Sequence, residues 1–315
     1  MLPHARSGTS PNWAVHVRFL DGPVFIGNTV ATMNFAEARD ALADADSRFV
    51  AVDGQTIHYK RSGAGPPLVL MHGSGSSLHT YDRVAEQLAS RADVIRMDLP
   101  GFGLTGPRPD RDYRVSAFVE TVDAFLRELG VVRAVVAGNS LGGNIAWNLA
   151  LRKPELVQGL VLINSTGYPG KSLPLAMKLA RNPFGRVLLR RFANRSGVER
   201  NLRGTVGPQF RDVVTPEFVD RVYSYMSLPG NQEAFIDLAR TDQVDTTDGL
   251  PLISAPTAVL RSAGMDGQHF ASVIPNSWER THPSAGHLLP DEDPDWLSAA
   301  IELFLDSRVI DTKDN

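Results

Sequence analysis

A serine set between glycines, at the junction of a strand and a helix, carries the clearest chemistry in this sequence. Val131 to Ala137 is an apolar, β-branched run typical of a buried strand, and Asn144 to Arg152 is typical of a helix. Between them stands Gly-Asn-Ser-Leu-Gly, with Ser140 at its centre. A turn of the G-x-S-x-G type holds its serine in a strained backbone, with the hydroxyl clear of the sheet. Gly138 and Gly142 are expected where the two backbones pass too close for a Cβ.

The pattern therefore indicates a nucleophilic serine, the alternative being a Gly-rich turn with an ordinary serine or a phosphate cradle. A serine hydroxyl needs a base within hydrogen-bond reach, and the base needs an orienting group. In proteins built around this kind of turn, the catalytic residues follow one another along the chain in the order serine, acid, histidine. His287 is the best base, because it follows a glycine in a loop between the last expected strand and the closing helix. His269 and His282 come late enough in the chain to compete.

Asp266 is the best candidate for the orienting acid. It follows the expected strand at Pro256 to Arg261, from which a loop carboxylate can reach an imidazole Nδ1. Its alternative role is an ordinary turn residue, since Asp-Gly is common turn chemistry. Three other residues compete for the same role by their position near strand ends or the histidine: Asn164, Asp291 and Asp293.

A tetrahedral intermediate also needs two donors aimed at its developing oxyanion. Leu141, directly after the serine, offers one main-chain N–H, and Ser74 in the His-Gly-Ser-Gly turn offers the other. Gly73 and Asn139 flank these donors and are expected to line the substrate site. His72 is expected to brace the loop.

The elements around these residues alternate between strand and helix. Asp53-Gly54 marks a hairpin between Arg48–Val52 and Gln55–Lys60. Beyond it the expected strands and helices are Leu68–Met71, Tyr81–Leu88, Asp93–Met97, Val115–Leu129, Val131–Ala137, Asn144–Arg152, Leu160–Ile163, Pro256–Arg261, Ser277–Thr281 and Asp295–Leu305. Such alternation predicts an α/β class with a mostly parallel, helix-flanked sheet. Ligands bind at the carboxyl ends of such strands, where Asp98 is expected to organise a loop.

Residues 168–248 contain no convincing strand and are expected to form an inserted helical lid. Its expected helices are Leu175–Arg181, Arg186–Asn194, Pro216–Met226 and Gln232–Arg240. The α/β core then comprises 48–167 and 249–315, and 1–47 is an extension of uncertain order with two short strands and a helix at Phe35 to Ala45.

Composition limits the classes of function. The chain has 315 residues and no cysteine, and the lack of cysteine excludes disulfides, a cysteine nucleophile and thiolate metal sites. Its net charge of −3 disfavours nucleic acid as a partner. No apolar stretch is long enough to span a membrane, and the amino terminus lacks a signal-peptide pattern. We expect a cytoplasmic monomer or homodimer that acts on a small-molecule ester-like substrate and needs no metal or organic cofactor.

The motifs His72-Gly-Ser-Gly, Asp98-Leu-Pro-Gly-Phe-Gly, Gly138-Asn-Ser-Leu-Gly-Gly and Ala285-Gly-His resemble, in this order, the α/β-hydrolase fold family. The similarity spans roughly residues 48–307. The resemblance implies that Ser140 is the nucleophile, Asp266 the acid and His287 the base. It also implies that Ser74 and Leu141 are the oxyanion donors and that 168–248 is a helical lid. Epoxide hydrolases and haloalkane dehalogenases of this fold carry aspartate at the turn, so a serine there argues against both.

The activity implied is hydrolysis of carboxylic esters or lactones through an acyl-enzyme. Gly-Asn-Ser-x-Gly-Gly is also similar to the meta-cleavage-product hydrolases, which cut carbon–carbon bonds. The chain departs from them because Leu288, not tryptophan, follows the histidine. The short interval between Asp266 and His287 departs from the pattern of the whole α/β-hydrolase family. Arg190 or Arg191 could grip a substrate carboxylate. A ligand receptor on a hydrolase scaffold, and a lid-mediated dimer whose basic helices bind a partner, are the alternatives from other classes.

Overall fold

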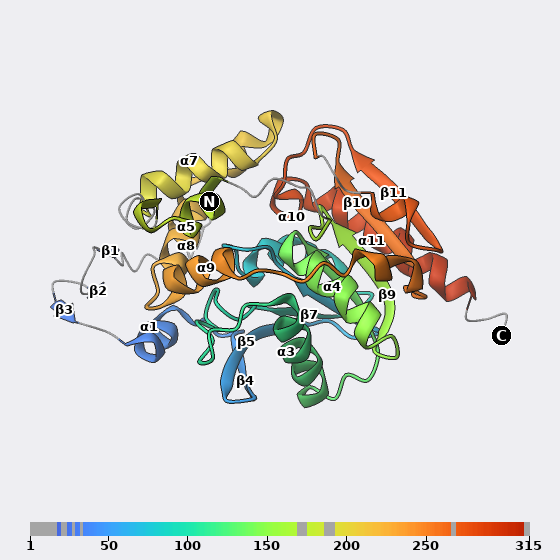
Figure 1. Ribbon diagram of the computed structural model, residues 1–315, viewed down its shortest axis with the longest axis horizontal. Coiled ribbons are helices and arrows are strands. Elements are labelled where there is room, and N and C mark those ends of the chain that lie inside the picture. Colours follow the sequence, from blue (N-terminus) through green and yellow to red (C-terminus); the bar gives the residue numbers. More distant parts are fainter. Residues whose placement is uncertain are drawn as a thin grey trace, which may run out of the picture.

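The fold is given by a computed structural model that describes residues 18–19, 24–26, 29–31, 34–168, 175–185, 193–265 and 269–311. Its centre is an eight-stranded sheet in the order β11-β10-β9-β8-β6-β7-β5-β4 (Figure 1). The strands are β4 (Arg48–Val52), β5 (Gln55–Ser62), β6 (Pro67–Met71), β7 (Asp93–Met97), β8 (Ala134–Asn139), β9 (Val157–Ile163), β10 (Thr257–Ser262) and β11 (Ser277–His282). Neighbours from β11 to β7 are parallel, and β5 and β4 are antiparallel. The predicted mostly parallel α/β sheet is confirmed.

The antiparallel edge is made by the predicted hairpin. Asp53 and Gly54 have φ values of 46° and 79°, so both central residues of the turn lie in the left-handed region. A two-residue turn with both φ values positive matches the right-handed twist of the flanking strands, which is why Asp-Gly is favoured there. This turn sets the β4–β5 register, with Val52 opposite Gln55.

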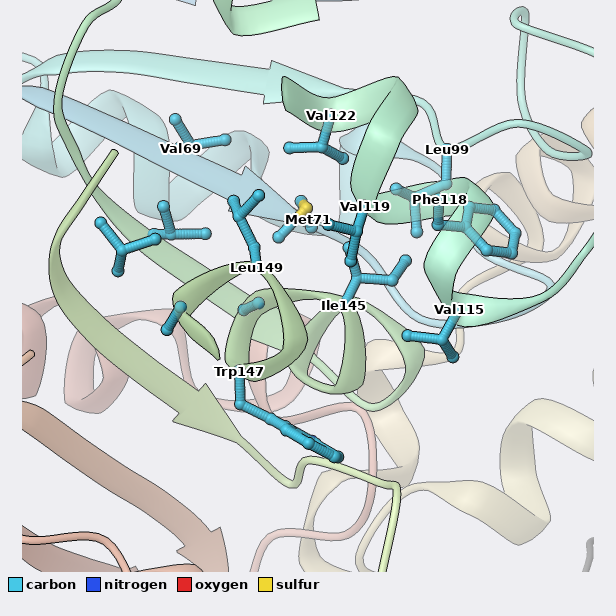
Figure 2. Packing of buried hydrophobic residues seen from close by; sticks show 14 of the residues in the cluster. Val69, Met71, Leu99, Val115, Phe118, Val119, Val122, Ile145, Trp147 and Leu149 are labelled. Atoms are coloured by element: carbon cyan, nitrogen blue, oxygen red, sulfur yellow. The ribbon is translucent and has the colours of Figure 1, made fainter. Parts of the chain in front are cut away.

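Helices cover both faces of the sheet. α3 (Val115–Glu128) and α4 (Leu141–Arg152) pack on one face, where Val69 and Met71 of β6 meet them (Figure 2). Leu68 and Leu70 belong to a second cluster on the other face, with α2 (Asp82–Leu88) and α11 (Pro294–Asp311). Because β6 is buried on both faces, its sequence is a continuous apolar run rather than an alternating one.

Near the amino terminus, β1 (Arg18–Phe19), β2 (Val24–Ile26) and β3 (Thr29–Ala31) form a separate antiparallel sheet with one more strand than predicted. α1 (Phe35–Leu42) follows at the predicted place, and a capping box of Asn34 and Glu37 fixes its start. Ala38 of α1 packs in a cluster with Leu104 and Leu228.

Between β9 and β10 the chain forms what we call the helical insertion, the described residues of 168–248. It holds α5 (Leu175–Arg181), α7 (Arg195–Thr205), α8 (Pro216–Met226) and α9 (Asn231–Arg240), which lie together beside the sheet (Figure 1). α7 and α8 share a small core of their own, whereas Ala234 and Leu238 of α9 join the main core. Sequence reasoning missed α7, and most of the helix predicted at 186–194 lies outside the described residues.

Candidate active site

Ser140 occupies the tight turn between β8 and α4. Its backbone has φ 55° and ψ −113°, a conformation that an L-residue adopts only under strain, and the residue is 7% exposed. The flanking glycines explain how the turn is held. A Cβ on Gly142 would lie 2.2 Å from the carbonyl oxygen of Met71, and one on Gly138 would lie 2.2 Å from the carbonyl carbon of Gly142. β6, β8 and α4 therefore meet at backbone distance directly beneath the serine.

The loop that follows β6 passes beside this turn. A Cβ built on Gly73 would stand 3.1 Å from the Ser140 Cβ and 3.2 Å from the Asn139 Oδ1. Ser74, the next residue, is half-buried. The predicted donor loop and the predicted nucleophile are thus neighbours in space.

Three strand ends converge on the loop that carries His287. Asn139, at the end of β8, donates its side-chain Nδ2 to the His287 carbonyl at 3.2 Å. Asn164, directly after β9, donates to the Gly286 carbonyl at 3.1 Å and to the His287 carbonyl at 3.4 Å. Ser262, which ends β10, donates its hydroxyl to the Gly286 carbonyl at 2.6 Å. The half-buried His287 is therefore held at the carboxyl edge of the sheet.

The competing histidines are placed differently. His282 is buried, and its Nδ1 accepts the Ala285 N–H at 2.8 Å while its Nε2 donates to Asp293 at 3.1 Å. Its ring thus shapes the turn that leads to His287. His269 is exposed, with its ring edge-on to that of Tyr168.

Asp266, the predicted acid, lies outside the described residues, which stop at Met265 and resume at His269. Each rival side chain is engaged elsewhere. The Asn164 Oδ1 accepts the Ser262 N–H at 2.8 Å, and its amide nitrogen binds the carbonyls described above. Asp291 accepts the Thr80 hydroxyl, and Asp293 accepts from His282.

A buried carboxylate organises the loops after β6 and β7. Asp98 accepts the His58 Nδ1 at 2.7 Å, the Leu78 N–H at 2.7 Å and the Leu104 N–H at 2.8 Å. Burial alone would raise the pKa of Asp98, but the charge and hydrogen bond of His58, with lesser help from His72, hold that pKa at about 2. The loops beside the candidate nucleophile are thus fixed to a buried anion.

His72 braces the Gly73 loop, as expected. Its Nδ1 donates to the Gly73 carbonyl at 2.7 Å, and its Nε2 accepts the Leu99 N–H at 2.9 Å. Complete burial lowers the pKa of His72, although Asp98 opposes this shift. The ring is therefore neutral, with both nitrogens used for structure.

The pKa of Asp291 is shifted in the opposite direction to that of Asp98. Its side chain is only 10% exposed, and burial raises its pKa to about 7, although the Thr80 bond and Arg221 pull the pKa down. An aspartate in the unfolded chain titrates near ~3.9. The native protein therefore binds more protons between these values, so its free energy of unfolding falls as pH rises from about 4 to about 7.

We expect Asp291→Asn to raise the melting temperature by roughly 2–5 °C at pH 8 and to change it little at pH 4.5. The neutral amide removes the cost of a buried charge, which exists only where the wild-type carboxyl is ionised. Thermal unfolding at both pH values measures this. Asp295→Asn, at an exposed aspartate, is the control and should show no such difference. An Asp291→Asn shift of equal size at the two pH values would contradict the expectation.

Sequence reasoning missed Glu292, which is 5% exposed and whose carboxylate accepts the N–H groups of both Gly286 and Leu288. It stands in an Asp-Glu-Asp run before the closing helix, and acidic runs in that position ordinarily cap a helix in solvent. Only the apolar Leu289-Pro290 beside it hints at burial.

The described residues contain neither a membrane-spanning helix nor a cluster of metal ligands. No described helix combines the length and apolar character needed to cross a bilayer. Within the same residues, no group of three or more His, Asp or Glu side chains is placed to hold a metal ion.

Comparisons with known proteins add to this geometry. A family model described as the alpha/beta hydrolase fold matches residues 66–294. The uncharacterised hydrolase YugF of Bacillus subtilis is 28% identical over 82% of this chain and 97% of its own length. The 2-hydroxymuconate semialdehyde hydrolase of Pseudomonas sp. strain CF600 is 32% identical over 68% of this chain and 72% of its length. A thermophilic esterase from Thermogutta terrifontis superposes with a TM-score of 0.69 over 84% of this chain and 99% of its own; at 24% identity this likeness concerns the fold alone.

Proposed function

Because the chain belongs to the α/β-hydrolase fold family, we propose that it is a serine hydrolase that cleaves carboxylic esters or lactones. The observation that carries the proposal is the convergence of three loops on Ser140. The strained turn presents the serine, Gly73 packs against its Cβ, and Asn139 binds the His287 peptide. A nucleophile, a donor loop and a base are the parts that acyl transfer requires.

In the proposed mechanism, His287 takes the proton of the Ser140 hydroxyl as the oxygen attacks the substrate carbonyl. The main-chain N–H groups of Ser74 and Leu141 bind the resulting oxyanion. Asp266 holds the imidazole tautomer and stabilises the imidazolium. His287 then gives its proton to the leaving alcohol and activates the water that releases the acyl group.

The position of the strand end that precedes Asp266 supports its proposed role as the acid. Ser262 closes β10, and its hydroxyl binds the Gly286 carbonyl next to His287. The chain that runs toward Asp266 thus starts beside the histidine loop. The rivals Asn164, Asp291 and Asp293 already bind other groups.

We also propose that residues 168–248 act as a lid over an α/β core of 48–167 and 249–315, with 1–47 as an extension. Two contacts support this. The His287 N–H donates to the Thr205 carbonyl at 3.0 Å, and Phe235 of α9 is the side chain nearest to a Cβ on Gly75, at 3.9 Å. The helical insertion therefore borders both the base and the donor loop.

A carbon–carbon hydrolase is the second candidate. It is favoured by the 2-hydroxymuconate semialdehyde hydrolase among the relatives and by the Gly-Asn-Ser-Leu-Gly-Gly motif. Leu288 after the histidine is evidence against it, because the histidine of those hydrolases is typically followed by tryptophan. Arg190 and Arg191, the candidates for binding a substrate carboxylate, lie outside the described residues.

A substrate panel separates the two. We expect kcat/KM for p-nitrophenyl acetate or butyrate to exceed that for a ring-fission dienoate by about 10²-fold or more, a difference of about 2.7 kcal/mol in transition-state stabilisation. Steady-state kinetics on both substrate classes measure this, with Ser140→Ala as the blank. A dienoate turned over faster than every ester would reverse the choice. Labelling of Ser140 by a fluorophosphonate without any ester turnover would instead favour a receptor.

A further inference from the structure

The buried carboxylate of Glu292 lies between the histidine loop and the helical insertion. Its Oε2 accepts the Gly286 N–H at 2.6 Å and the Gly207 N–H at 2.7 Å. Its Oε1 accepts the Leu288 N–H at 2.9 Å. One side chain therefore binds the residues on both sides of His287 and a turn of the insertion that lies 85 positions away in sequence.

The peptide between those two residues is held by the same turn. The His287 N–H donates to the Thr205 carbonyl at 3.0 Å. Together with Glu292, this bond occupies the N–H groups of three consecutive residues, 286 to 288. The carbonyls of Gly286 and His287 are bound by Ser262 and Asn139. The backbone that carries the imidazole is thus fixed from the sheet on one side and from the insertion on the other.

The turn at 205–207 is pressed against the histidine loop without spare room. A Cβ on Gly207 would lie 2.2 Å from the Ser284 carbonyl oxygen. A Cβ on Gly286 would lie 2.4 Å from the Thr205 carbonyl oxygen. At these distances the two backbones are in direct contact, so the turn cannot slide along the loop without breaking the bonds to Glu292 and to the His287 N–H.

We propose that Glu292 is a positioning residue for His287, and that it makes correct placement of the imidazole depend on docking of the 205–207 turn. This rests on the proposed role of His287 as the base. A carboxylate that is 5% exposed has little water to bind, so the three N–H groups are its main partners among the described residues. If the turn lifts, the carboxylate and the His287 N–H each lose a partner in a buried site. The docked turn and the placed histidine therefore stabilise one another.

The test variant is Glu292→Gln, which keeps the shape but replaces one acceptor oxygen by a donor. Both oxygens of Glu292 now accept N–H groups, so an amide in either orientation points its NH₂ at a donor. Because a small misplacement of a catalytic group can cost about 10²-fold, we expect kcat for p-nitrophenyl butyrate to fall by about that factor with KM within about threefold. Glu292→Asp keeps the charge and should retain more kcat than Glu292→Gln.

Asp93→Asn is the matched control. Asp93 is also buried, at 8% exposed, and binds Arg61 at the amino end of β7, away from the carboxyl edge that carries the candidate site. It should lower the melting temperature but leave kcat of the folded protein within about twofold. A Glu292→Gln enzyme whose kcat matches that of Asp93→Asn would overturn the proposal.

A second measurement does not depend on activity. Amide hydrogen exchange of peptides covering 203–208 and 284–289 should quicken together by about tenfold or more in Glu292→Gln, and should stay unchanged in Asp93→Asn. Unchanged exchange in either peptide of Glu292→Gln would refute the coupling, even if kcat falls. A wild-type chain that hydrolyses no ester would instead count against the proposed function, and the exchange result would still decide the role of Glu292.

Discussion

Replacing Ser140 by alanine is expected to lower kcat for ester hydrolysis by about 10⁶-fold and to abolish fluorophosphonate labelling. The substitution removes the hydroxyl that we propose forms the acyl-enzyme, while keeping the Cβ that packs near Gly73. The fold should therefore survive, and the melting temperature should stay within about 2 °C of wild type. Kinetics with p-nitrophenyl butyrate and intact-mass measurement after labelling check both statements.

Ser298→Ala is the matched control for this experiment. Ser298 is a serine of α11 that is 4% exposed, and it lies outside the three loops that converge on Ser140. Its loss should leave kcat and labelling unchanged. Residual activity above about 1% in Ser140→Ala would mean that another residue supplies the nucleophile, and the proposed mechanism would then be wrong.

The second large effect is expected at Asp266. Asparagine there can still hydrogen-bond the imidazole, but it favours the wrong tautomer and leaves the imidazolium without its counter-charge, so kcat should fall by about 10⁴-fold. The melting temperature and KM should change far less. Steady-state kinetics at pH 8 measure the loss.

The rival orienting residues provide the comparison. Asn164 binds backbone carbonyls of the histidine loop, and Asp291 binds Thr80. We therefore expect Asn164→Ala to lower stability and to reduce kcat by about tenfold at most, and Asp291→Asn to keep kcat within about twofold. If either variant loses more activity than Asp266→Asn, the role of orienting His287 moves to that residue.

Much of the fold could be predicted because its signals are local. Asp53-Gly54 sets a hairpin by its own backbone preference, and apolar runs such as Leu68–Met71 identify strands buried on both faces. The missed helix α7 shows the limit. It contains Gly197 and Gly204, which disfavour an isolated helix, and it is stabilised by packing of Val198 and Leu202 against α8. That packing partner is not visible in the local pattern.

The candidate site divides in the same way. Ser140 and His287 follow from a local motif and from chain order, and the structure places their loops side by side. Asn164 is a rival orienting group by its position in the sequence, yet it binds main-chain groups of the histidine loop, and no sequence pattern marks Glu292. Contacts between a side chain and a distant backbone leave no periodicity or spacing in the sequence, because they depend on how two loops meet after folding.

The two members of the proposed catalytic pair are held by different kinds of contact. Ser140 lies where β6, β8 and α4 touch at backbone distance, whereas His287 lies on a loop that is hydrogen-bonded to a turn of the helical insertion. Segments outside the core open with free energies below that of global unfolding, whereas core strands separate only near the global value. Heat or mild denaturant should therefore abolish activity by separating His287 from Ser140 before the central sheet unfolds. Activity should return quickly when the protein is cooled or the denaturant is diluted.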